Sequence, residues 1–387
     1  MPLRNKNNDS RVSDGRKLIL FAMTAMVMSV LAISSTPSAS ALYVFKNMWG
    51  EKGTGNGQFD SIGGIAVFSS GNVFPSIDVF VVDTLNDRVQ KFHMSNPCPT
   101  GTTQVVVGVC FVTKWGTHGS GPGQFNQPRG IDLDSSGNVF VADALNHRIQ
   151  KFTFTGTFIR EWGQFGTQNG QFRFPNDVAL NRQGTVFVVD TGNNRTQKFS
   201  NTGGFIRSWG TTGTGDGQFE FPHSLAVAET GNVFVTEREN HRIQKFSNTG
   251  TFLAKTLPND LGWLNGIGID PTGKVYATDG QFERIKEFTN DLHFISGWGQ
   301  FGHGPGQWAG PTDLDIVTPG LTVFKYVYVV DFFNNRVQIY FWEPDVHPNI
   351  SKNYTSTTNY TGANHTNGTT NMNKMTNTTS INATTVK

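Results

Sequence analysis

The sequence has few charged residues and almost no excess of either sign. Of its 387 residues, 16% are Asp, Glu, Lys or Arg, and the formal net charge is +2. Proteins that gather nucleic acid or anionic lipid usually concentrate many Lys and Arg residues. The composition therefore predicts that nucleic acid is not a partner.

Recognisable catalytic motifs are also lacking. The sequence contains no H-E-x-x-H, G-x-S-x-G, P-loop or C-x-x-C motif, and these patterns mark common zinc, serine, nucleotide and redox sites. The sequence thus offers no positive sign of an enzyme, and it predicts no cofactor.

Long apolar runs are absent except near the N-terminus. Residues 18–33 carry no charge, follow several Lys and Arg residues, and precede small residues that end in Ala39-Ser40-Ala41. This order is typical of a secretory signal, so we expect residues 1–41 to be removed, leaving a secreted or cell-surface protein without a membrane span. The alternative is an uncleaved anchor, because the run is only slightly shorter than a membrane span.

Glycine and phenylalanine are abundant by comparison, with 44 and 32 copies. Gly at this density indicates many turns, and Phe supplies large apolar area for strand packing, so the composition favours an all-β fold. One phrase, typified by Asn-His-Arg-Ile-Gln-Lys-Phe, recurs at residues 86–92, 146–152, 193–199, 240–246, 282–288 and 334–340. An acidic residue precedes each arginine of this phrase by a constant spacing: Asp83, Asp143, Asp190, Glu237, Asp279 and Asp331. The chain therefore contains six copies of a repeat of roughly 47 residues.

Each repeat predicts four short strands, typified by residues 130–133, 138–143, 148–152 and 158–163, with turn signals between them. A four-stranded antiparallel unit repeated radially is a propeller blade. The array begins with a lone fourth-strand phrase at residues 45–50 and stops after a third-strand phrase at 334–341. If residues 45–49 supply the outer strand of the last blade, the ring closes without a long unpaired edge. We therefore predict an all-β, six-bladed β-propeller over residues 42–345, closed by an N-terminal outer strand, and an open solenoid is the alternative.

Three recurring phrases resemble those of the NHL repeat family. They are NxRIQKF, the GIAVD type seen as GIDLD at residues 130–134, and WGxxGxGxGQF, seen at residues 115–125. The resemblance covers residues 45–341 and implies a six-bladed propeller. Blade five departs from it, because Phe282 replaces the Asn and residues 255–257 replace the Trp-Gly pair.

Cysteine is scarce, since Cys98 and Cys110 are the only two and both lie in one insertion between repeat phrases. In an exported protein, a disulfide that closes this loop is the direct interpretation. Two free thiols are the alternative.

Repetition separates scaffold residues from candidate ligand contacts. Residues shared by nearly every blade, such as the acid and arginine pairs, are expected to hold the blades together. The positions just before strand one and the turn between strands two and three lie at one end of the ring, with the long Trp-Gly loops, and loops that vary carry function. The candidate ligand-binding residues on this loop-rich face are Arg129, Asn176, Asp177, His223, Arg238, Asn265, Thr312, Asp313, Phe332 and Phe333. Ordinary solvated loop residues are the alternative interpretation.

No metal site is predicted, and Asp132, Asp315 and His223 are only weak candidates. Asp132 and Asp315 replace the Ala of strand one in blades two and six. They are expected either near the channel as free carboxylates or as hydrogen-bonded core acids. His223 is a single histidine, and a zinc site needs three or four ligands.

Three functions compete. The leading hypothesis is an extracytoplasmic binding or scaffold propeller that engages a protein, peptide or glycan through its loop-rich face. The alternative, implied by the resemblance, is a metal-dependent enzyme of the lyase or lactonase type with calcium or zinc in the central channel. The resemblance also implies RNA binding as a third hypothesis, which export and the neutral charge balance disfavour. The sequence predicts no oligomeric state.

The C-terminal part of the chain, residues 346–387, is rich in Asn and Thr. Sequons occur at Asn349, Asn353, Asn359, Asn364, Asn367, Asn377 and Asn382. We expect a disordered tail that forms a glycosylated stalk or spacer, with chance sequons as the alternative. Asn194 also begins a sequon, but its place in the repeat phrase argues against modification.

Overall fold

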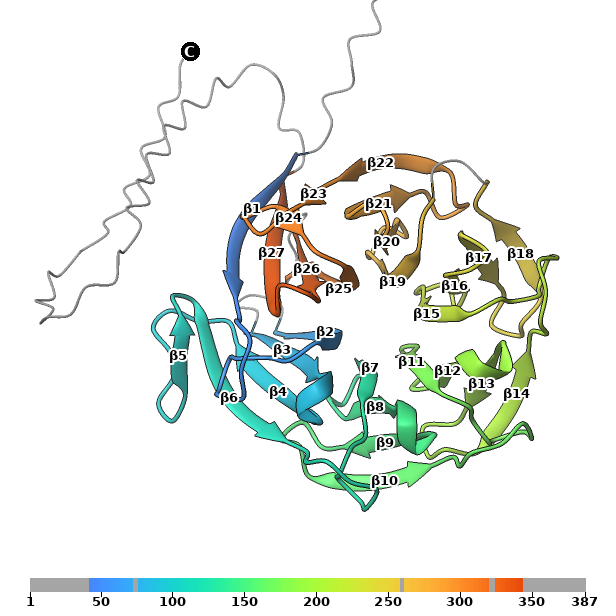
Figure 1. Ribbon diagram of the computed structural model, residues 1–387, viewed down its shortest axis with the longest axis horizontal. Helices are drawn as coiled ribbons and strands as arrows, with labels where there is room; N and C mark the ends of the chain where they lie inside the picture. The colour runs from blue at the N-terminus through green and yellow to red at the C-terminus, as the bar shows by residue number, and fades with distance from the viewer. Residues whose placement is uncertain (1–41, 72–75, 258–260, 320–323, 344–387) are drawn as a thin grey trace, which may run out of the picture. The chain divides into compact units, whose positions relative to one another are not determined.

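The computed structural model describes residues 42–71, 76–257, 261–319 and 324–343, which form a ring of six small sheets (Figure 1). The predicted signal at residues 1–41 and the tail sequons from Asn349 to Asn382 lie outside the described residues. Within the described ranges the helices are short 3-10 turns, η1 (Thr84–Asn86), η2 (Ala144–Asn146) and η3 (Thr191–Asn193). None of these described helices is long and apolar enough to cross a membrane.

Each blade is an antiparallel sheet whose strands follow one another outward from the centre of the ring. Blade one contains β2 (Ile62–Ser70), β3 (Ser76–Asp83), β4 (Arg88–His93) and β6 (Val109–Trp115), with β5 (Thr103–Val106) outside β6. Blade two contains β7 (Pro128–Leu133), β8 (Val139–Asp143), β9 (Arg148–Phe152) and β10 (Phe158–Trp162). Blade three contains β11 (Pro175–Leu180), β12 (Val186–Asp190), β13 (Arg195–Phe199) and β14 (Phe205–Trp209).

The second half of the ring repeats this order. Blade four contains β15 (Pro222–Val227), β16 (Val233–Glu237), β17 (Arg242–Phe246) and β18 (Phe252–Lys255). Blade five contains β19 (Leu264–Ile269), β20 (Val275–Asp279), β21 (Arg284–Phe288) and β22 (Phe294–Trp298), followed by the short parallel pair β23 (Gln300–Phe301) and β24 (Gln307–Trp308). Blade six contains β25 (Pro311–Val317), β26 (Lys325–Asp331), β27 (Arg336–Glu343) and β1 (Leu42–Trp49).

Ring closure comes from the N-terminal strand. Strand β1 pairs antiparallel with β27, with Phe45 opposite Tyr340 and Trp49 opposite Val337. The last blade is therefore completed by the first strand of the chain, so that the two ends of the propeller are hydrogen-bonded in one sheet. The predicted six-bladed, permuted propeller is confirmed.

The hydrophobic core lies between the blades. In β8, Val139 and Val141 pack toward blade one, whereas Phe140 and Ala142 pack toward blade three. A strand buried on both faces needs a continuous apolar run, which is what the repeat supplies at this position. Each such Val or Phe contributes about 1.5–3 kcal/mol on burial. Trp115 of blade one lies against Phe152 of blade two, with ring centroids 5.9 Å apart, so this tryptophan packs between two blades.

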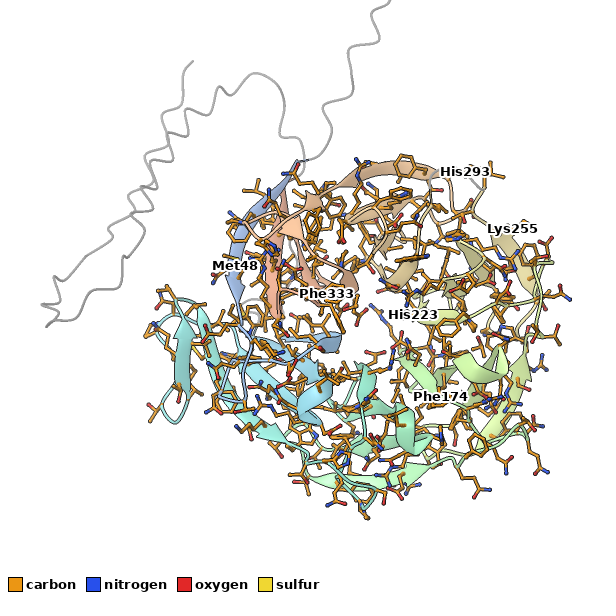
Figure 2. The ribbon with its side chains drawn as sticks, viewed as in Figure 1. Met48, Phe174, His223, Lys255, His293 and Phe333 are labelled. Carbon is orange, nitrogen blue, oxygen red and sulfur yellow. A yellow bond between two sulfur atoms is a disulfide. The ribbon has the colours of Figure 1, made fainter. Side chains whose placement is uncertain are left out.

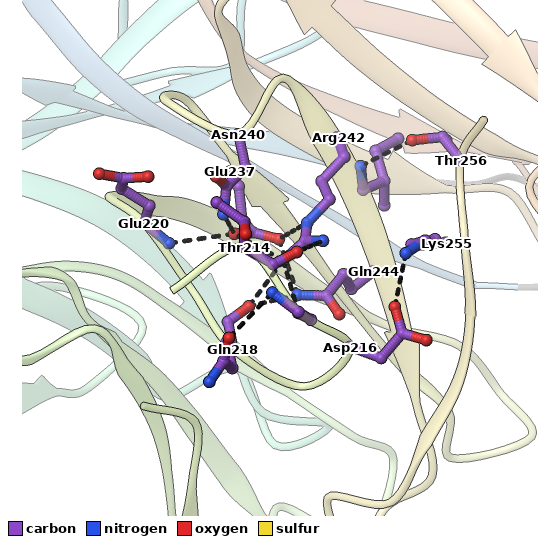
Figure 3. A network of polar contacts seen from close by, with 12 residues as sticks. Thr214, Asp216, Gln218, Glu220, Glu237, Asn240, Arg242, Gln244, Lys255 and Thr256 are labelled. Atoms are coloured by element: carbon purple, nitrogen blue, oxygen red, sulfur yellow. Dashed lines mark hydrogen bonds and ion pairs between the residues drawn. The ribbon is translucent and has the colours of Figure 1, made fainter. Parts of the chain in front are cut away.

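The repeated acid and arginine pairs hold the long loops of the loop-rich face, as Figure 3 shows for blade four. Arg242 donates through Nε to Glu237 Oε1 at 2.6 Å, and its Nη groups donate to the carbonyl oxygens of Thr214, Gly215 and Gln218. Blade five differs, because Arg284 is exposed and the Nζ of Lys286 lies 3.1 Å from Asp279 instead. The predicted scaffold role is thus confirmed, and the loops that surround the channel are held in place before any ligand binds.

The insertion in blade one forms a hairpin with β5 and β6. The structure pairs Cys98 with Cys110 in a disulfide, with Cα atoms 5.6 Å apart. The hairpin also reaches the closing strand, where Asn47 Nδ2 donates to the carbonyl oxygen of Val107 at 2.9 Å. The insertion therefore braces the junction at which the ring closes.

Candidate ligand-binding mouth of the channel

The centre of the ring holds two cavities with a constriction between them. The channel mouth, on the loop-rich face, is a cavity of about 160 Å³ whose lining includes Arg129, Asn176, His223 and Phe332. The lower chamber is a cavity of about 210 Å³ lined by the innermost strands of all six blades. A third hollow of only about 10 Å³ shares Asn176 and His223 with the mouth and Asp177 and Asp313 with the chamber.

Arg129 supplies a cation to the mouth. It follows Pro128 at the start of β7, and its Nη1 donates to Asn176 Oδ1 at 3.0 Å. Within the described residues this is its only hydrogen bond, and it forms no ion pair. Partial removal from bulk water lowers the pKa of the Arg129 guanidinium group, and the charge of Arg238 lowers it further. Asn176 thus orients a guanidinium group that still has most of its five N–H donors unused.

Arg238 lies on the same loop-rich face, but it is not among the residues that line the mouth. It follows Glu237 at the end of β16, but the carboxylate of Glu237 is already bonded to Arg242. The guanidinium carbon of Arg238 lies 5.1 Å from the ring centroid of Trp263, an arrangement that holds the side chain by a cation–π contact. Among the described residues Arg238 has no carboxylate partner.

His223 lines the mouth from β15, and Figure 2 shows it reaching toward the centre of the ring. Burial lowers the pKa of His223 to about 3, and the charges of Arg129 and Arg238 contribute to the same shift. The imidazole is therefore neutral at pH 7. Its Nδ1 atom is buried and makes no hydrogen bond within the described part of the chain.

The lower chamber is acidic, and its carboxylates are bonded to the backbone. Asp132 accepts the N–H of Leu133 and, across the gap between blades two and three, the N–H of Leu180, each at 2.7 Å. Asp315 similarly accepts the N–H of Ile316 and of Val67 in blade one. These two residues thus join neighbouring blades and also line the chamber, so they lie at the channel and are hydrogen-bonded at the same time.

Burial raises the pKa of these chamber carboxyls. The pKa of Asp132 rises to about 8, and the charge of Asp315 adds to the effect of burial. The pKa values of Asp177 and Asp315 rise to about 6, again because the groups are removed from bulk water. The pKa of Asp313 is also raised by burial, and by the charge of Asp177.

Several other predicted ligand contacts connect blades instead. Asp177 accepts Ser224 Oγ at 2.5 Å and the N–H of Leu225, while Asp313 accepts the N–H of Ile65. Three further residues donate to carbonyl oxygens of the next blade, namely Asn176 to His223, Asn265 to Pro311 and Thr312 to Ile62. Phe332 lines the mouth, and Phe333 beside it is 72% exposed.

The sequence analysis selected Phe333 but missed four other exposed aromatic residues on the loop-rich face. We call Phe174, Phe221, Trp263, Phe282 and Phe333 the aromatic rim, and each is at least 43% exposed. Phe174 and Phe221 have φ of 54° and 53°, a left-handed conformation that is uncommon for bulky residues. Their N–H groups are bonded to His147 Nδ1 and Asn194 Oδ1 of the preceding blade. Their position in the sequence could have revealed three of them, because Phe174, Phe221 and Trp263 directly precede strand one of their blades, next to the predicted ligand contacts.

The hydrogen bond between Phe221 and Asn194 involves the first residue of the internal sequon. Asn194 accepts the N–H of Phe221 through Oδ1 and donates through Nδ2 to Thr212 Oγ1. Thr196, the third residue of the sequon, is fully buried. Both observations support the expectation that Asn194 is not modified.

The weak metal candidates are not brought together. Asp132 and Asp315 line the lower chamber, whereas His223 lines the mouth. In the described ranges, no group of three or more His, Cys, Asp or Glu residues could hold a metal ion. The prediction that the protein needs no cofactor stays a prediction.

A larger hollow of about 620 Å³ lies between the blade-one hairpin and the ring. Its charged lining residues already have partners, because Arg336 is paired with Asp331 and Glu51 accepts a hydrogen bond from Gln58. The channel mouth, where Arg129 lacks a carboxylate partner, is therefore the stronger candidate site.

Comparison with known proteins supports the repeat assignment. The NHL repeat profile matches residues 125–152, 172–199 and 219–246, in blades two, three and four. NHL repeat-containing protein 3 of Homo sapiens is 34% identical to the chain over 110 residues, which covers 27% of this chain and 26% of that protein. The match thus spans about a quarter of the curated relative's length.

Solved structures share the fold. A structural genomics protein of unknown function from Bacteroides thetaiotaomicron superposes with a TM-score of 0.53 at 15% identity, over 79% of this chain and 77% of that chain. Virginiamycin B lyase from Staphylococcus aureus superposes with a TM-score of 0.49 at 13% identity, over 76% of this chain and 99% of that chain. At such identities the likeness concerns the fold alone. Blades two, three and four therefore carry NHL repeats, within a six-bladed β-propeller.

Proposed function

We propose that this protein is an extracytoplasmic binding propeller that engages a protein or peptide through its loop-rich face. NHL propellers generally serve as protein-binding scaffolds, which supports the general class. The predicted signal and the tail sequons support a location outside the cytoplasm.

The observation that carries the proposal is the aromatic rim. Large exposed apolar groups gathered on one face mark interaction sites, and aromatic residues are enriched among the side chains that dominate binding energy. Phe174, Phe221 and Trp263 occupy equivalent positions in three consecutive blades, so they form an arc around the mouth. The arginine contacts that hold the loops reduce the ordering cost that binding would otherwise incur.

The test is selection from a random peptide display library on the secreted protein. Peptides selected on the wild type should lose affinity by about tenfold or more on the double variant Phe174→Ala and Phe221→Ala, because two anchors are removed. Phe294→Ala is the matched control, since Phe294 is 62% exposed but lies on the outer strand β22.

Selection that yields no peptides, or peptides equally sensitive to the Phe294 control, would contradict the proposal. A glycan array that binds the wild type through the same rim would assign the face to a glycan instead. Mass spectrometry of the secreted protein tests the address, with an N-terminus at Leu42 and occupied tail sequons expected. An intact Met1 on a cell-retained protein would contradict export.

A further inference from the structure

A tryptophan fills the seam between neighbouring blades at four places around the ring. Each lies at the end of an outer strand and contacts a phenylalanine near the end of the third strand of the next blade. The pairs, with ring centroids between 5.4 and 6.1 Å apart, are Trp49 with Phe92, Trp115 with Phe152, Trp162 with Phe199, and Trp209 with Phe246. The indole Nε1 atoms of these tryptophans make no hydrogen bond within the described residues. These seams therefore hold an indole ring by packing alone.

The seam between blades four and five lacks such a ring. Thr256 directly follows β18 and takes the position that Trp209 has at the end of β14. Its hydroxyl oxygen accepts the N–H of Ile243 from its own blade. Phe288, which ends the third strand of blade five, contacts the ring of Phe294 but no tryptophan ring within the described residues. One aromatic ring is therefore missing from this seam.

The residue that lies against the tryptophan changes together with it. Blades two, three and four have a glycine there, and a Cβ atom on Gly156, Gly203 or Gly250 would come within 2.5–2.8 Å of the indole ring of the preceding blade. Blade five has Leu292 instead, which is buried and has a positive φ of 65°. The larger residue fits because no tryptophan occupies the seam, so the two replacements form one local departure from the repeat.

Leu292 does not fill all the space that the missing ring leaves. A hollow of about 260 Å³ remains at the seam, and its lining includes Thr256, Leu257, Leu261, Phe288, Leu292 and Phe294. Figure 2 shows His293, which also lines the hollow, at the outer edge of the ring. An apolar cavity of about 150 Å³ is already large enough to bind benzene. The hollow therefore has room for a large aromatic side chain.

Two residues of the lining are largely exposed, since Leu257 is 69% and Phe294 62% accessible to solvent. A free small molecule in the hollow would leave most of this apolar surface in water. An aromatic side chain that arrives on a peptide brings its backbone and neighbouring side chains with it, and these can cover both residues. Aromatic anchors that fill a pocket dominate the binding energy of many protein interfaces. The exposed lining therefore favours a peptide or protein as the source of the ring.

We infer that the hollow between blades four and five is a docking site for one aromatic side chain of a peptide or protein partner. The ring of the partner takes the place that a tryptophan of the chain itself occupies in the other seams. This site goes beyond the proposed function, because no residue of the aromatic rim lines it.

The experiment is an NMR titration of the folded protein with N-acetyltryptophanamide, which carries a tryptophan side chain between two amide groups. N-acetylalaninamide, which has the same amides without the ring, and free indole, which has the ring without the amides, are the comparison ligands. The ring signals of His293 report on the hollow, and their assignment comes from their loss in His293→Gln.

Three variants test where the ligand binds. Thr256→Trp combined with Leu292→Gly restores the repeat at this seam and fills the hollow from within. Phe294→Ala removes one exposed wall of the hollow. Phe205→Ala is the matched control, because Phe205 begins β14 as Phe294 begins β22, but at a seam that Trp162 already fills.

We expect N-acetyltryptophanamide to shift the His293 signals in a saturable manner, and N-acetylalaninamide to bind about tenfold more weakly or not at all. The refilled variant, Thr256→Trp with Leu292→Gly, should lose this binding and keep at least the wild-type thermal midpoint. Phe294→Ala should weaken binding by about tenfold, whereas Phe205→Ala should leave it unchanged.

Equal binding of the two amides, or wild-type affinity in the folded refilled variant, would overturn the inference. Absence of binding would show that the chain itself covers the hollow, and would also overturn it. Free indole that binds about tenfold more tightly than N-acetyltryptophanamide would assign the hollow to a small aromatic ligand instead. If the refilled variant does not fold, Phe294→Ala decides, and wild-type affinity in that variant would contradict the docking site.

The hollow and the aromatic rim fail in different ways. Peptides that lose affinity on Phe294→Ala but not on the double variant Phe174→Ala and Phe221→Ala bind in the hollow, and peptides with the opposite pattern bind on the rim. The docking site therefore stands or falls without the rim.

Discussion

The channel mouth and the lower chamber occupy the same axis of the propeller, yet they treat charge in opposite ways. In the lower chamber, Asp132 and Asp315 each accept backbone N–H groups from two neighbouring blades. In the mouth, Arg129 is oriented by Asn176 but has no carboxylate partner in the described chain. Polar groups that the fold uses are bonded within it, whereas a polar group with unused donors on an accessible face is available to a ligand.

The largest expected effect concerns the bonded carboxylates. Asp177→Ala removes the acceptor of Ser224 Oγ and of the Leu225 N–H at the contact between blades three and four. Because buried donors are left unsatisfied, the free energy of unfolding should fall by about 2–4 kcal/mol. Denaturant unfolding measures it, and Asp216→Ala, which removes an exposed acid paired with Lys255, should cost less than about 1 kcal/mol. Equal losses of unfolding free energy in the two variants would contradict the view that the bonded carboxyl group of Asp177 holds the blades together.

A smaller effect should appear in the pH dependence of stability. Burial raises the pKa of Asp132 to about 8, so the folded state keeps a proton that the unfolded chain releases near about pH 4. The stability that this proton provides is complete below the unfolded pKa and is lost as pH rises through the folded pKa. Between about pH 7 and about pH 9 the free energy of unfolding should fall by about 1 kcal/mol, and Asp132→Asn should flatten this part of the profile. His223 contributes little in this window, because its folded pKa of about 3 and the ordinary imidazole pKa of about 6.5 in the unfolded chain both lie below it.

Stability should change least when Arg238 is replaced. Arg238→Gln breaks no side-chain hydrogen bond within the described residues, although it removes the contact with Trp263. We expect the free energy of unfolding to stay within about 0.5 kcal/mol of the wild type. A loss of about 2 kcal/mol or more would show that Arg238 belongs to the scaffold, as the chamber carboxylates do.

Metal removal should have no effect on the fold. The oxygens of Asp132 and Asp315 are engaged by backbone N–H groups, which leaves little capacity for a cation. Dialysis against a chelator should therefore leave the thermal midpoint unchanged. Stoichiometric calcium or zinc in the purified protein, lost in Asp132→Asn, would instead support the alternative of a metal-dependent enzyme.

The sequence was sufficient to predict the fold, because each repeated phrase forms one particular strand or loop contact of a blade. The outer-strand phrase at residues 45–50 predicted the closing strand, and the acid and arginine spacing predicted the contact that holds each loop. The site was less predictable. Differences between blades singled out Arg129, His223 and Arg238, but the same criterion selected Asp177 and Asp313, which connect blades. Sequence position cannot tell a bonded polar group from a free one.

Most of the aromatic rim was missed because the sequence does not distinguish exposed aromatic rings from buried ones. Phe174 and Phe221 lie next to the buried Phe172 and Phe219 of the repeated loop, and both pairs look alike in the sequence. Only the left-handed backbone at Phe174 and Phe221 turns these two rings outward into solvent. That conformation depends on a hydrogen bond from the preceding blade, which is a contact between distant parts of the chain.

The central claim is most directly tested by measuring peptide affinity and unfolding free energy together in two variants, the double variant Phe174→Ala and Phe221→Ala, and Asp177→Ala. The account predicts that the double variant stays within about 0.5 kcal/mol of wild-type stability, because both rings are exposed, and loses about tenfold in peptide affinity. It predicts that Asp177→Ala loses about 2–4 kcal/mol of stability, while its folded fraction binds the peptide like the wild type. The reverse pattern, with the double variant unfolded more easily and binding unchanged, would contradict the account.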